Sequence, residues 1–392
     1  MKSDFFTYQA QTSPHPLSLE ISHAKGSYVY DTNNKPYLDF IAGVSANTLG
    51  HNHPKVSEAI KKQVDSYTHV MVYGEFIQKP QVELCKALAA TILTKDCAVY
   101  LTNSGTEATE GALKLAKRFT GKTEIVAAKN GYHGNTQGAM SVCGVEEQNR
   151  AFRPLIPGIK FIEFNLESDL QKITKKTAAV ILETIQGGAG FIEPTNNYLQ
   201  KVQHRCNEVG ALLILDEIQT GIGRTGKFWG FENYNCIPDI IVTGKGLGGG
   251  MPIGAFIAEK KVMNVLQDSP KLGHITTFGG HPVIAAAGLA TVTEINNSNL
   301  IQETLLKEHF VRGYLQHSAI KEIRGRGLML AAIVETPEIA SQIILKCMDT
   351  GLLLFWLLFE GKAIRITPPL TISDEELKKG CDLLLSAINE VV

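Results

Sequence analysis

The segment from Asp239 to Phe256 carries one lysine, Lys245, between an apolar run and a series of glycines. A lysine that is removed from water loses its proton more easily, and its neutral amine can then form a Schiff base with a carbonyl. A lone lysine in a turn is more often a solvated surface residue, so Lys245 needs supporting residues before it indicates catalysis. The glycines at 246 and 248–250 allow the backbone to approach another group closely or to adopt a positive φ.

Asp216 ends a second apolar run, Leu212 to Leu215, which is typical of a buried strand. Lys245 follows a similar run, so both side chains are expected at the same edge of one sheet. A buried carboxylate requires a cationic or hydrogen-bonding partner. The alternative interpretation of Asp216 is a helix cap or a hydrogen-bond acceptor in the core.

Three small residues, Ser104, Gly105 and Thr106, lie between a predicted strand and a predicted helix. Free backbone N–H groups at a helix N-terminus can bind a phosphate, although an ordinary helix cap explains these residues equally well. Tyr132 supplies an aromatic face. Pyridoxal 5'-phosphate needs a phosphate site, a lysine for its aldehyde and a carboxylate facing its pyridinium nitrogen. Taken together, these residues indicate a site for that cofactor.

Other motifs favour different cofactors but match them poorly. Gly221 to Lys227 reads G-x-x-x-x-G-K, as in a phosphate-binding P-loop, but Phe228 stands where a hydroxyl would hold magnesium. The tract GKGLGG only loosely resembles a dinucleotide fingerprint, and no helical pattern follows it. His51 and His53 lack a cluster of further ligands, so we expect no metal site. A nucleotide-binding enzyme is therefore a weak alternative.

The order of predicted elements indicates an α/β fold. Strands are expected at CAVYLTN, TEIVAAK, TAAVILET and ALLILDE, and helices at GTEATEGALKLAKRFTG and NNYLQKVQHRCNEVG. Nearly continuous apolar strands separated by helices predict a mostly parallel sheet that is covered by helices on both faces. Residues 28–45 predict two short strands around a turn. From about residue 280 the pattern predicts a smaller α/β lobe with an antiparallel sheet.

Composition and charge exclude several classes of protein. The chain has 392 residues and a formal net charge of −1, so it lacks the basic surface that nucleic acid requires. Its longest apolar runs, such as residues 352–356, are too short to cross a membrane, and no secretory signal is apparent. Seven scattered cysteines without a C-x-x-C pair favour reduced thiols. We therefore expect a cytoplasmic protein that binds neither nucleic acid nor membranes.

The longest motifs resemble those of the class III aminotransferases, fold type I pyridoxal-phosphate enzymes, and especially the acetylornithine and ornithine aminotransferases. The resemblance extends from YLDFIAGVSANTLGHNHPKV through LTNSGTEATEGALKLAK, LLILDEIQTGIGRTG and TGKGLGGGMPIGA to TTFGGHP and IRITPPLTIS. It implies a large cofactor-binding domain at 46–280 and a small C-terminal domain at 281–392. An N-terminal segment, residues 1–45, is expected to pack with the small domain.

The resemblance also implies roles for individual residues. Lys245 corresponds to the lysine that binds the cofactor aldehyde and shuttles a proton, and Asp216 to the partner of the pyridine nitrogen. Arg365 corresponds to the arginine that binds a substrate carboxylate, a task that suits a planar guanidinium. Thr277 corresponds to a phosphate contact from the other subunit, so a homodimer with shared active sites is expected. The remaining cofactor-binding residues are expected to be Ser104, Gly105, Thr106, Tyr132, His133, Glu183 and Gln219.

One departure from the family pattern concerns a second substrate carboxylate. Asn135 stands where the acetylornithine and ornithine enzymes usually have an arginine that binds this group. Asn135 is short and neutral, so the clamp is absent or is supplied from elsewhere. Arg150 and Arg153 are candidates by sequence position alone.

Two further departures lie at Gly188 and His281. Gly188 stands where the family has a glutamate that can pair with the substrate arginine. Without that glutamate Arg365 should stay available, so we expect a carboxylate against Arg365 in both half-reactions. His281 replaces an asparagine of the family pattern, and the sequence offers no reason for this change.

The predicted reaction is a ping-pong transamination. The donor is an acetylornithine- or ornithine-like amino acid, or a related ω- or α-amino acid, and the acceptor is a 2-oxo acid, with 2-oxoglutarate favoured by family analogy. Alternatives on the same scaffold are an aminomutase, a decarboxylase or an epimerase. A non-catalytic ligand-binding protein that retains the fold is the remaining alternative, and intact Lys245, Asp216 and Gln219 argue against it.

Overall fold

The computed structural model describes residues 1–392 and contains three β-sheets. The largest is a seven-stranded sheet with the strand order β4-β10-β9-β8-β7-β5-β6. Neighbouring strands from β9 to β6 run parallel, whereas β10 runs antiparallel to both β4 and β9. The predicted, mostly parallel sheet is thus confirmed. Its strands are β4 (Cys97–Thr102), β5 (Glu124–Ala128), β6 (Ile159–Ile162), β7 (Thr177–Glu183), β8 (Leu212–Asp216), β9 (Ile240–Gly244) and β10 (Gly254–Glu259).

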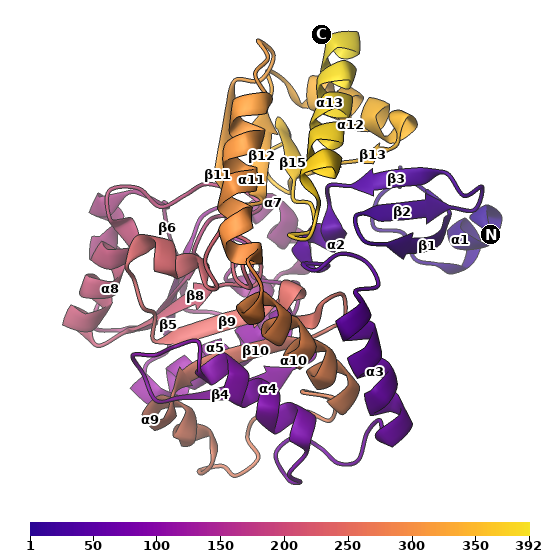
Figure 1. Cartoon of the computed structure of the whole chain (residues 1–392). Helices are drawn as coiled ribbons and strands as arrows, with labels where there is room; N and C mark the ends of the chain where they lie inside the picture. Colours follow the sequence, from indigo (N-terminus) through magenta and orange to yellow (C-terminus); the bar gives the residue numbers. More distant parts are fainter.

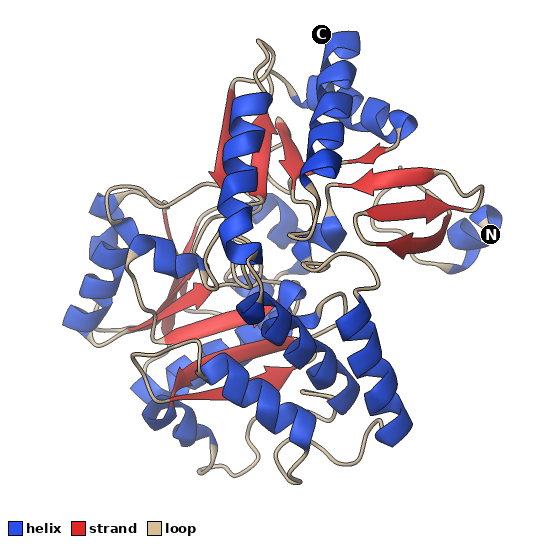
Figure 2. Cartoon of the chain, viewed as in Figure 1, coloured by secondary structure: helices blue, strands red, loops and turns tan.

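Helices cover both faces of this sheet (Figure 2). In β8, Leu213 and Leu215 belong to one core cluster and Leu212 and Ile214 to another, because successive side chains of a strand point to opposite faces. The first cluster includes residues of α3, α4, α8 and α10, and the second includes residues of α5. The helices of this part are α3 (Pro54–Ser66), α4 (Lys79–Ala89), α5 (Gly105–Thr120), α6 (Gln137–Ser141), α7 (Glu146–Asn149), α8 (Tyr198–Val209), α9 (Lys260–Met263) and α10 (Pro282–Asn297).

The C-terminal part forms a separate sheet with helices, as expected from the sequence (Figure 1). Its strand order is β11-β12-β15-β14, and all three neighbouring pairs are antiparallel. The strands are β11 (Glu322–Arg326), β12 (Met329–Ile333), β14 (Phe355–Trp356) and β15 (Ala363–Ile366), and the helices are α11 (Leu300–Tyr314), α12 (Pro337–Thr350) and α13 (Asp374–Val391).

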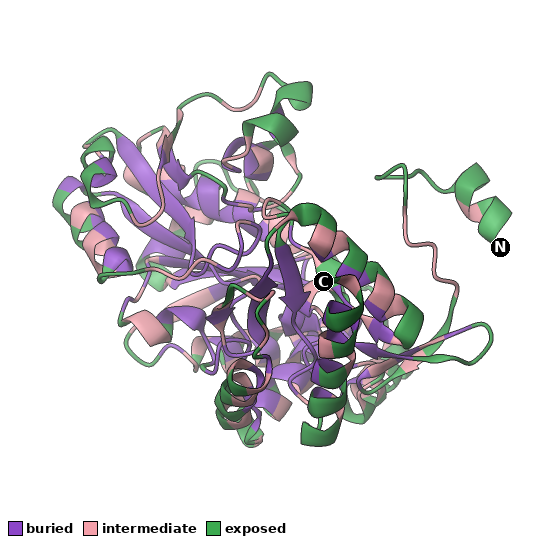
Figure 3. Cartoon of the chain, turned by 90° about the horizontal axis from the view of Figure 1, so that it is seen from above, coloured by how far each residue is buried: buried purple, intermediate pink, exposed green.

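The N-terminal segment joins the C-terminal part through a third sheet, with the order β1-β2-β3-β13. Strand β13 pairs in parallel with β3, and the Ser27 hydroxyl donates to Glu376 of α13 at 2.9 Å. The first residues, including α1, are largely exposed and extend away from the body (Figure 3). The elements are α1 (Lys2–Tyr8), β1 (Ile21–Lys25), β2 (Tyr28–Asp31), β3 (Pro36–Asp39), α2 (Ala42–Ser45) and β13 (Leu352–Leu353).

Helix α10 makes its contacts with α3, α4 and the turn that contains Lys245. The sequence placed this helix in the C-terminal domain, at 281–392, whereas its packing partners belong to the 46–280 region. The division into domains stays a prediction. No helix in the protein combines the length and the apolar character that a membrane crossing requires.

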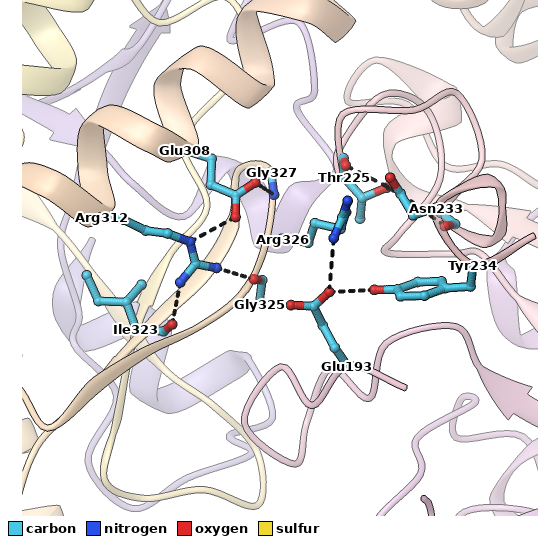
Figure 4. A network of polar contacts seen from close by, with 11 residues as sticks. Glu193, Thr225, Asn233, Tyr234, Glu308, Arg312, Ile323, Gly325, Arg326 and Gly327 are labelled. Carbon is cyan, nitrogen blue, oxygen red and sulfur yellow. Dashed lines mark hydrogen bonds and ion pairs between the residues drawn. The ribbon is translucent and has the colours of Figure 1, made fainter. Parts of the chain in front are cut away.

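Polar contacts connect the large sheet with the C-terminal sheet (Figure 4). Glu193, in the loop after β7, accepts a hydrogen bond from the Tyr234 hydroxyl at 2.7 Å and lies 3.5 Å from Arg326 at the end of β11. Arg312 of α11 donates to backbone carbonyls of β11. Because β11 pairs with β12 and β12 with β15, these contacts hold the strand that carries Arg365 relative to the central sheet.

Candidate active site

A cavity of ≈ 390 Å³ lies at the carboxyl ends of β7, β8 and β9. Ligand sites of parallel sheets are found at this edge, and the volume falls in the range of small-molecule pockets. Most of the residues selected from the sequence meet here. Those that line the cavity are Gly105, Thr106, Tyr132, His133, Asn135, Glu183, Asp216, Gln219, Lys245 and Arg365.

Lys245 follows β9 directly and has a φ of 41°, which is rare for a residue with a side chain. Burial lowers the pKa of its ammonium group, and the negative charge of Asp216 offsets part of this effect. Lys245 lines the cavity, where its amine can reach a ligand. A Cβ on the next residue, Gly246, would lie 2.8 Å from Oγ1 of Thr48, which explains why a glycine stands there.

Asp216 ends β8 and pairs with His133 in the interior. Its Oδ2 accepts from Nδ1 of His133 at 2.8 Å, and its Oδ1 accepts from the backbone N–H of Ile218 at 2.9 Å. Burial alone would lower the pKa of His133, but the hydrogen bond and the charge of Asp216 outweigh it, so that the pKa is raised. Asp216 is therefore held as an oriented carboxylate that faces the cavity.

Glu183 ends β7, the neighbouring strand, and organises two turns at the cavity. Its carboxylate accepts from the backbone N–H of Tyr132 at 3.0 Å and from that of Gly187 at 2.9 Å. Burial raises the pKa of Glu183 to about 7. These contacts place the Tyr132 ring at the cavity wall, where the sequence predicts that it stacks on a cofactor ring.

The residues expected to bind phosphate begin helix α5. Ser104 caps this helix, because its hydroxyl accepts from the backbone N–H of Glu107 at 3.3 Å, and it does not line the cavity. Gly105 and Thr106 do line it. A Cβ on Gly105 would lie 2.6 Å from the Ile218 side chain, so only glycine lets the backbone approach this closely. The first turn of α5 thus presents backbone N–H groups beside the lysine and the aspartate, and this donor set fits pyridoxal phosphate.

Arg365 lies on β15 and reaches the cavity from the C-terminal part. Its Nε and Nη1 are buried and have no hydrogen-bond partner, and Nη2 only approaches the Trp356 carbonyl at 3.5 Å. Burial lowers the pKa of Arg365 to about 10, so it remains charged at neutral pH. A buried guanidinium with two free donors is suited to bind a carboxylate.

The residues that sequence reasoning missed are mostly apolar. Val44 lies in a turn in which four consecutive residues, 42–45, have φ between 48° and 68°, a left-handed geometry that side chains disfavour. Gln219 donates to Ser45 of this turn at 3.5 Å. No pattern of spacing or charge distinguishes such positions in a sequence, because an apolar residue that lines a cavity has the same sequence pattern as an apolar residue in the core. The apolar lining consists of Val44, Ile185, Ile218, Phe355, Trp356 and Leu358.

Two arginines proposed to replace the missing clamp do not line the cavity. Arg150 and Arg153 are exposed, and Arg153 pairs instead with Glu146 at 2.5 Å. Neither candidate therefore lies where it could bind a second substrate carboxylate in the cavity of this chain. Asn135 does line the cavity. Thr277, expected to serve a neighbouring subunit, is exposed and lies outside the cavity.

The remaining sequence motifs have structural roles. His281, which the sequence left unexplained, caps α10 by accepting from the backbone N–H of Val283 at 3.3 Å. In the P-loop-like tract, Arg224 is fully buried and donates to the carbonyls of Leu328 at 3.0 Å and Pro368 at 2.6 Å. That loop therefore joins the two parts of the protein. No group of three or more histidine, cysteine or acidic side chains is arranged to hold a metal ion.

Comparison with known proteins agrees with this geometry. A family profile described as "Aminotransferase class-III" matches residues 8–388. The chain is 38% identical over 380 residues to an acetylornithine aminotransferase of Caldanaerobacter subterraneus subsp. tengcongensis, covering 94% of each. It is 38% identical over 377 residues to an acetylornithine aminotransferase of Bacillus subtilis (strain 168), covering 94% of this chain and 95% of that one. The crystal structure of the ornithine aminotransferase from Toxoplasma gondii ME49 superposes with a TM-score of 0.92 at 30% identity, covering 100% of this chain and 96% of that one.

Proposed function

Because the chain belongs to the class III aminotransferases, we propose that its cavity transfers an amino group from an acetylornithine- or ornithine-like ω- or α-amino acid to a 2-oxo acid. The predicted enzyme class, a transaminase, and the predicted cofactor, pyridoxal 5'-phosphate, are both confirmed by family membership. The reaction proceeds in two half-reactions, in which donor and acceptor use the same cavity in turn.

The observation that carries this proposal is the juxtaposition of Lys245 and Asp216 at neighbouring strand ends, with Arg365 free in the same cavity. When bound, the cofactor ring accepts the electron pair that remains after a substrate carbon loses its proton. Lys245, whose pKa is lowered by burial, would remove that proton and return it to the carbon of the cofactor that carried the aldehyde. Asp216, oriented by His133, would hold the protonated ring nitrogen, and Arg365 would hold the substrate carboxylate.

The experiment follows the absorbance of purified holoenzyme through one half-reaction at a time. An amino donor should shift the cofactor spectrum, and a 2-oxo acid added afterwards should restore it with release of a new amino acid. Consumption of the amino acid without any need for a 2-oxo acid would instead support an aminomutase, a decarboxylase or an epimerase. No spectral change with any donor would support the non-catalytic alternative.

A homodimer with shared active sites belongs to the same proposal. Loops 67–78 and 268–280 lie against each other, because the Tyr73 N–H donates to the Thr276 carbonyl at 3.2 Å and the His69 and Phe278 rings are 4.8 Å apart. Exposed apolar side chains gathered on adjacent loops are typical of an interaction site, and Thr277 lies on one of these loops. The large hydrophobic side chains exposed on the two loops are Val70, Met71, Phe76, Ile77, Leu272, Ile275 and Phe278.

Sedimentation velocity tests the dimer. Ile77→Lys places a charge at a side chain that is 95% exposed and should convert dimer to monomer with loss of activity. Leu93→Lys, at a side chain that is 93% exposed outside these loops, is the matched control and should leave the dimer intact. A monomeric wild type with full activity would contradict the shared site. The cytoplasmic location expected from the sequence stays a prediction.

A further inference from the structure

The cavity contains few charged groups, and nearly all of them are engaged. The lysine, arginine and acidic residues that line it are Lys245, Arg365, Asp216 and Glu183. Asp216 is paired with His133, Glu183 accepts two backbone N–H groups, and Lys245 is reserved for the cofactor under the proposed function. Of these four residues only Arg365 is left with free donors, at Nε and Nη1; Nε2 of His133 also lacks a partner, but that ring is paired with Asp216. One protomer therefore offers a substrate one unpaired charge, and that charge is positive.

The side of the cavity next to Arg365 is apolar. Phe355, Trp356 and Leu358 line it from β14 and the loop that follows. The only polar side-chain atom among them, Nε1 of Trp356, donates to the Ser341 hydroxyl of α12 at 3.0 Å, so it is not available to a ligand. We call these three residues the apolar wall.

Gly188 keeps an acidic side chain away from the apolar wall. A Cβ at this position would lie 2.8 Å from the Phe359 ring and 3.5 Å from Cβ of Leu358. The backbone fixes this contact, because the Phe359 N–H donates to the Gly188 carbonyl at 2.9 Å. Phe359 thus fills the space that a side chain at 188 would need, and Arg365 has no acidic neighbour to neutralise it. Asn135, on the same cavity, adds a neutral amide.

The following inference rests on the proposed function. We propose that this enzyme uses amino acids and 2-oxo acids that carry a single carboxylate. Arg365 binds this carboxylate, and the rest of the substrate, which is uncharged, packs on the apolar wall. A second charge on the substrate would lose part of its hydration against the apolar wall and would find no partner of opposite sign in this protomer. Specificity then arises from that desolvation as much as from contacts with the preferred substrate.

The test compares matched substrates on the holoenzyme. The acceptors 2-oxopentanoate and 2-oxoglutarate have five carbons each and differ in a terminal methyl or carboxylate. The donors acetylornithine and ornithine differ in one positive charge. We expect kcat/KM to favour 2-oxopentanoate and acetylornithine, each by at least about tenfold.

Leu358→Lys provides the reciprocal test, because this wall residue is 54% exposed and can carry an ammonium group at the cavity mouth. In this variant, kcat/KM for 2-oxoglutarate divided by kcat/KM for 2-oxopentanoate should rise about tenfold. Leu306→Lys makes the same substitution on exposed α11, outside the cavity, and Leu358→Met changes the wall without adding charge. Leu306→Lys should leave the ratio unchanged, and Leu358→Met should change it much less than Leu358→Lys does.

The outcomes separate the inference from the proposed function. A wild type that uses 2-oxoglutarate as well as or better than 2-oxopentanoate overturns the inference while leaving transamination intact. A Leu358→Lys ratio equal to that of Leu358→Met overturns it as well. Failure of every donor to change the cofactor spectrum contradicts the proposed function itself.

Discussion

The two sides of the cavity are built on different principles. On the cofactor side Asp216, His133 and Glu183 are buried and hydrogen bonded to one another or to the backbone of turns. On the substrate side Arg365 is equally buried, yet two of its nitrogens have no partner. The acidic groups of the first side find their partners within the protein, whereas these two nitrogens of Arg365 are satisfied only when an anion enters.

The difference also follows the elements that supply the residues. The cofactor side comes from the ends of β7 and β8, parallel strands of one rigid sheet, and from the turn that follows β9. The substrate side comes from β14, β15 and the loop between them, which belong to another sheet. Gly188 and Asn135, the two cavity residues that the sequence predicts to depart from the family pattern, lie in loops after β7 and β5, so the central sheet also contributes to the part of the cavity that is expected to vary.

The largest effect should come from Lys245→Ala on the cofactor side. The variant loses the only amine at the cavity that can move the proton, so kcat should fall by about 10⁴-fold or more. Borohydride reduction followed by mass spectrometry should find the cofactor tag on Lys245 in the wild type and no tag in the variant. Lys175→Ala, an exposed lysine remote from the cavity, is the control. Ordinary turnover by Lys245→Ala would refute the assignment.

Asp216→Asn should have the next largest effect. The amide keeps the size of the side chain but removes the charge that raises the pKa of His133 and that would face the ring nitrogen. We expect kcat to fall by about 10²–10³-fold with a smaller change in KM, because this interaction strengthens as the reaction proceeds. Asp65→Asn, on exposed α3, is the control, and circular dichroism checks that the fold persists. A rise in KM alone would instead place Asp216 on the substrate side.

The sequence revealed the cofactor side more completely than the substrate side, for physical reasons. Lys245 and Asp216 stand out because a charged residue directly after a buried apolar strand is costly and therefore informative. Both residues follow strands of a parallel sheet, and ligands of such sheets bind outside the carboxyl ends of the strands, so the edge at which the two residues meet could be predicted. Val44 and Trp356 carry no such signal, because their contacts depend on a left-handed turn and on how the second sheet packs.

Contacts between segments that are far apart in the sequence could not be predicted from local patterns either. Arg150 and Arg153 looked suitable for a second carboxylate, yet only the three-dimensional path of their loop shows that they face solvent. The position of α10 against α3 and α4 likewise depends on tertiary contacts that no local pattern records.

Arg365→Gln should produce a smaller effect than either cofactor-side variant. Loss of the charged donors should lower kcat/KM for carboxylate substrates by about 10–10²-fold, mainly through KM. An amine without a carboxylate should be affected much less. Arg365→Lys keeps the charge but not the planar fork, and it should recover only part of the activity. Equal losses for substrates with and without a carboxylate would show that Arg365 supports the fold and does not bind substrate.

The two sides should also influence the pH dependence of stability differently. Burial raises the pKa of Glu183 to about 7, so the folded protein holds a proton there that the unfolded chain releases near pH 4.5. Stability from this group is present at low pH and is lost as pH rises from about 4.5 through 7, by about 3 kcal/mol. Arg365, with a pKa of about 10, stays charged throughout that interval and adds no slope.

Urea unfolding of Glu183→Gln and Arg365→Gln at pH 5 and pH 7.5 tests this difference. Glu183→Gln lowers stability at pH 5, because one of its two backbone donors loses its acceptor, but the fall between the two pH values should become smaller. Arg365→Gln should leave that fall unchanged. The same flattening in Glu217→Gln, whose buried carboxylate also has a pKa of about 7 but lies outside the cavity, would separate the effect of burial from that of the site. An unaltered slope in Glu183→Gln would mean that Glu183 is already ionised at pH 5, and the cofactor side would then hold a second permanent negative charge beside Asp216.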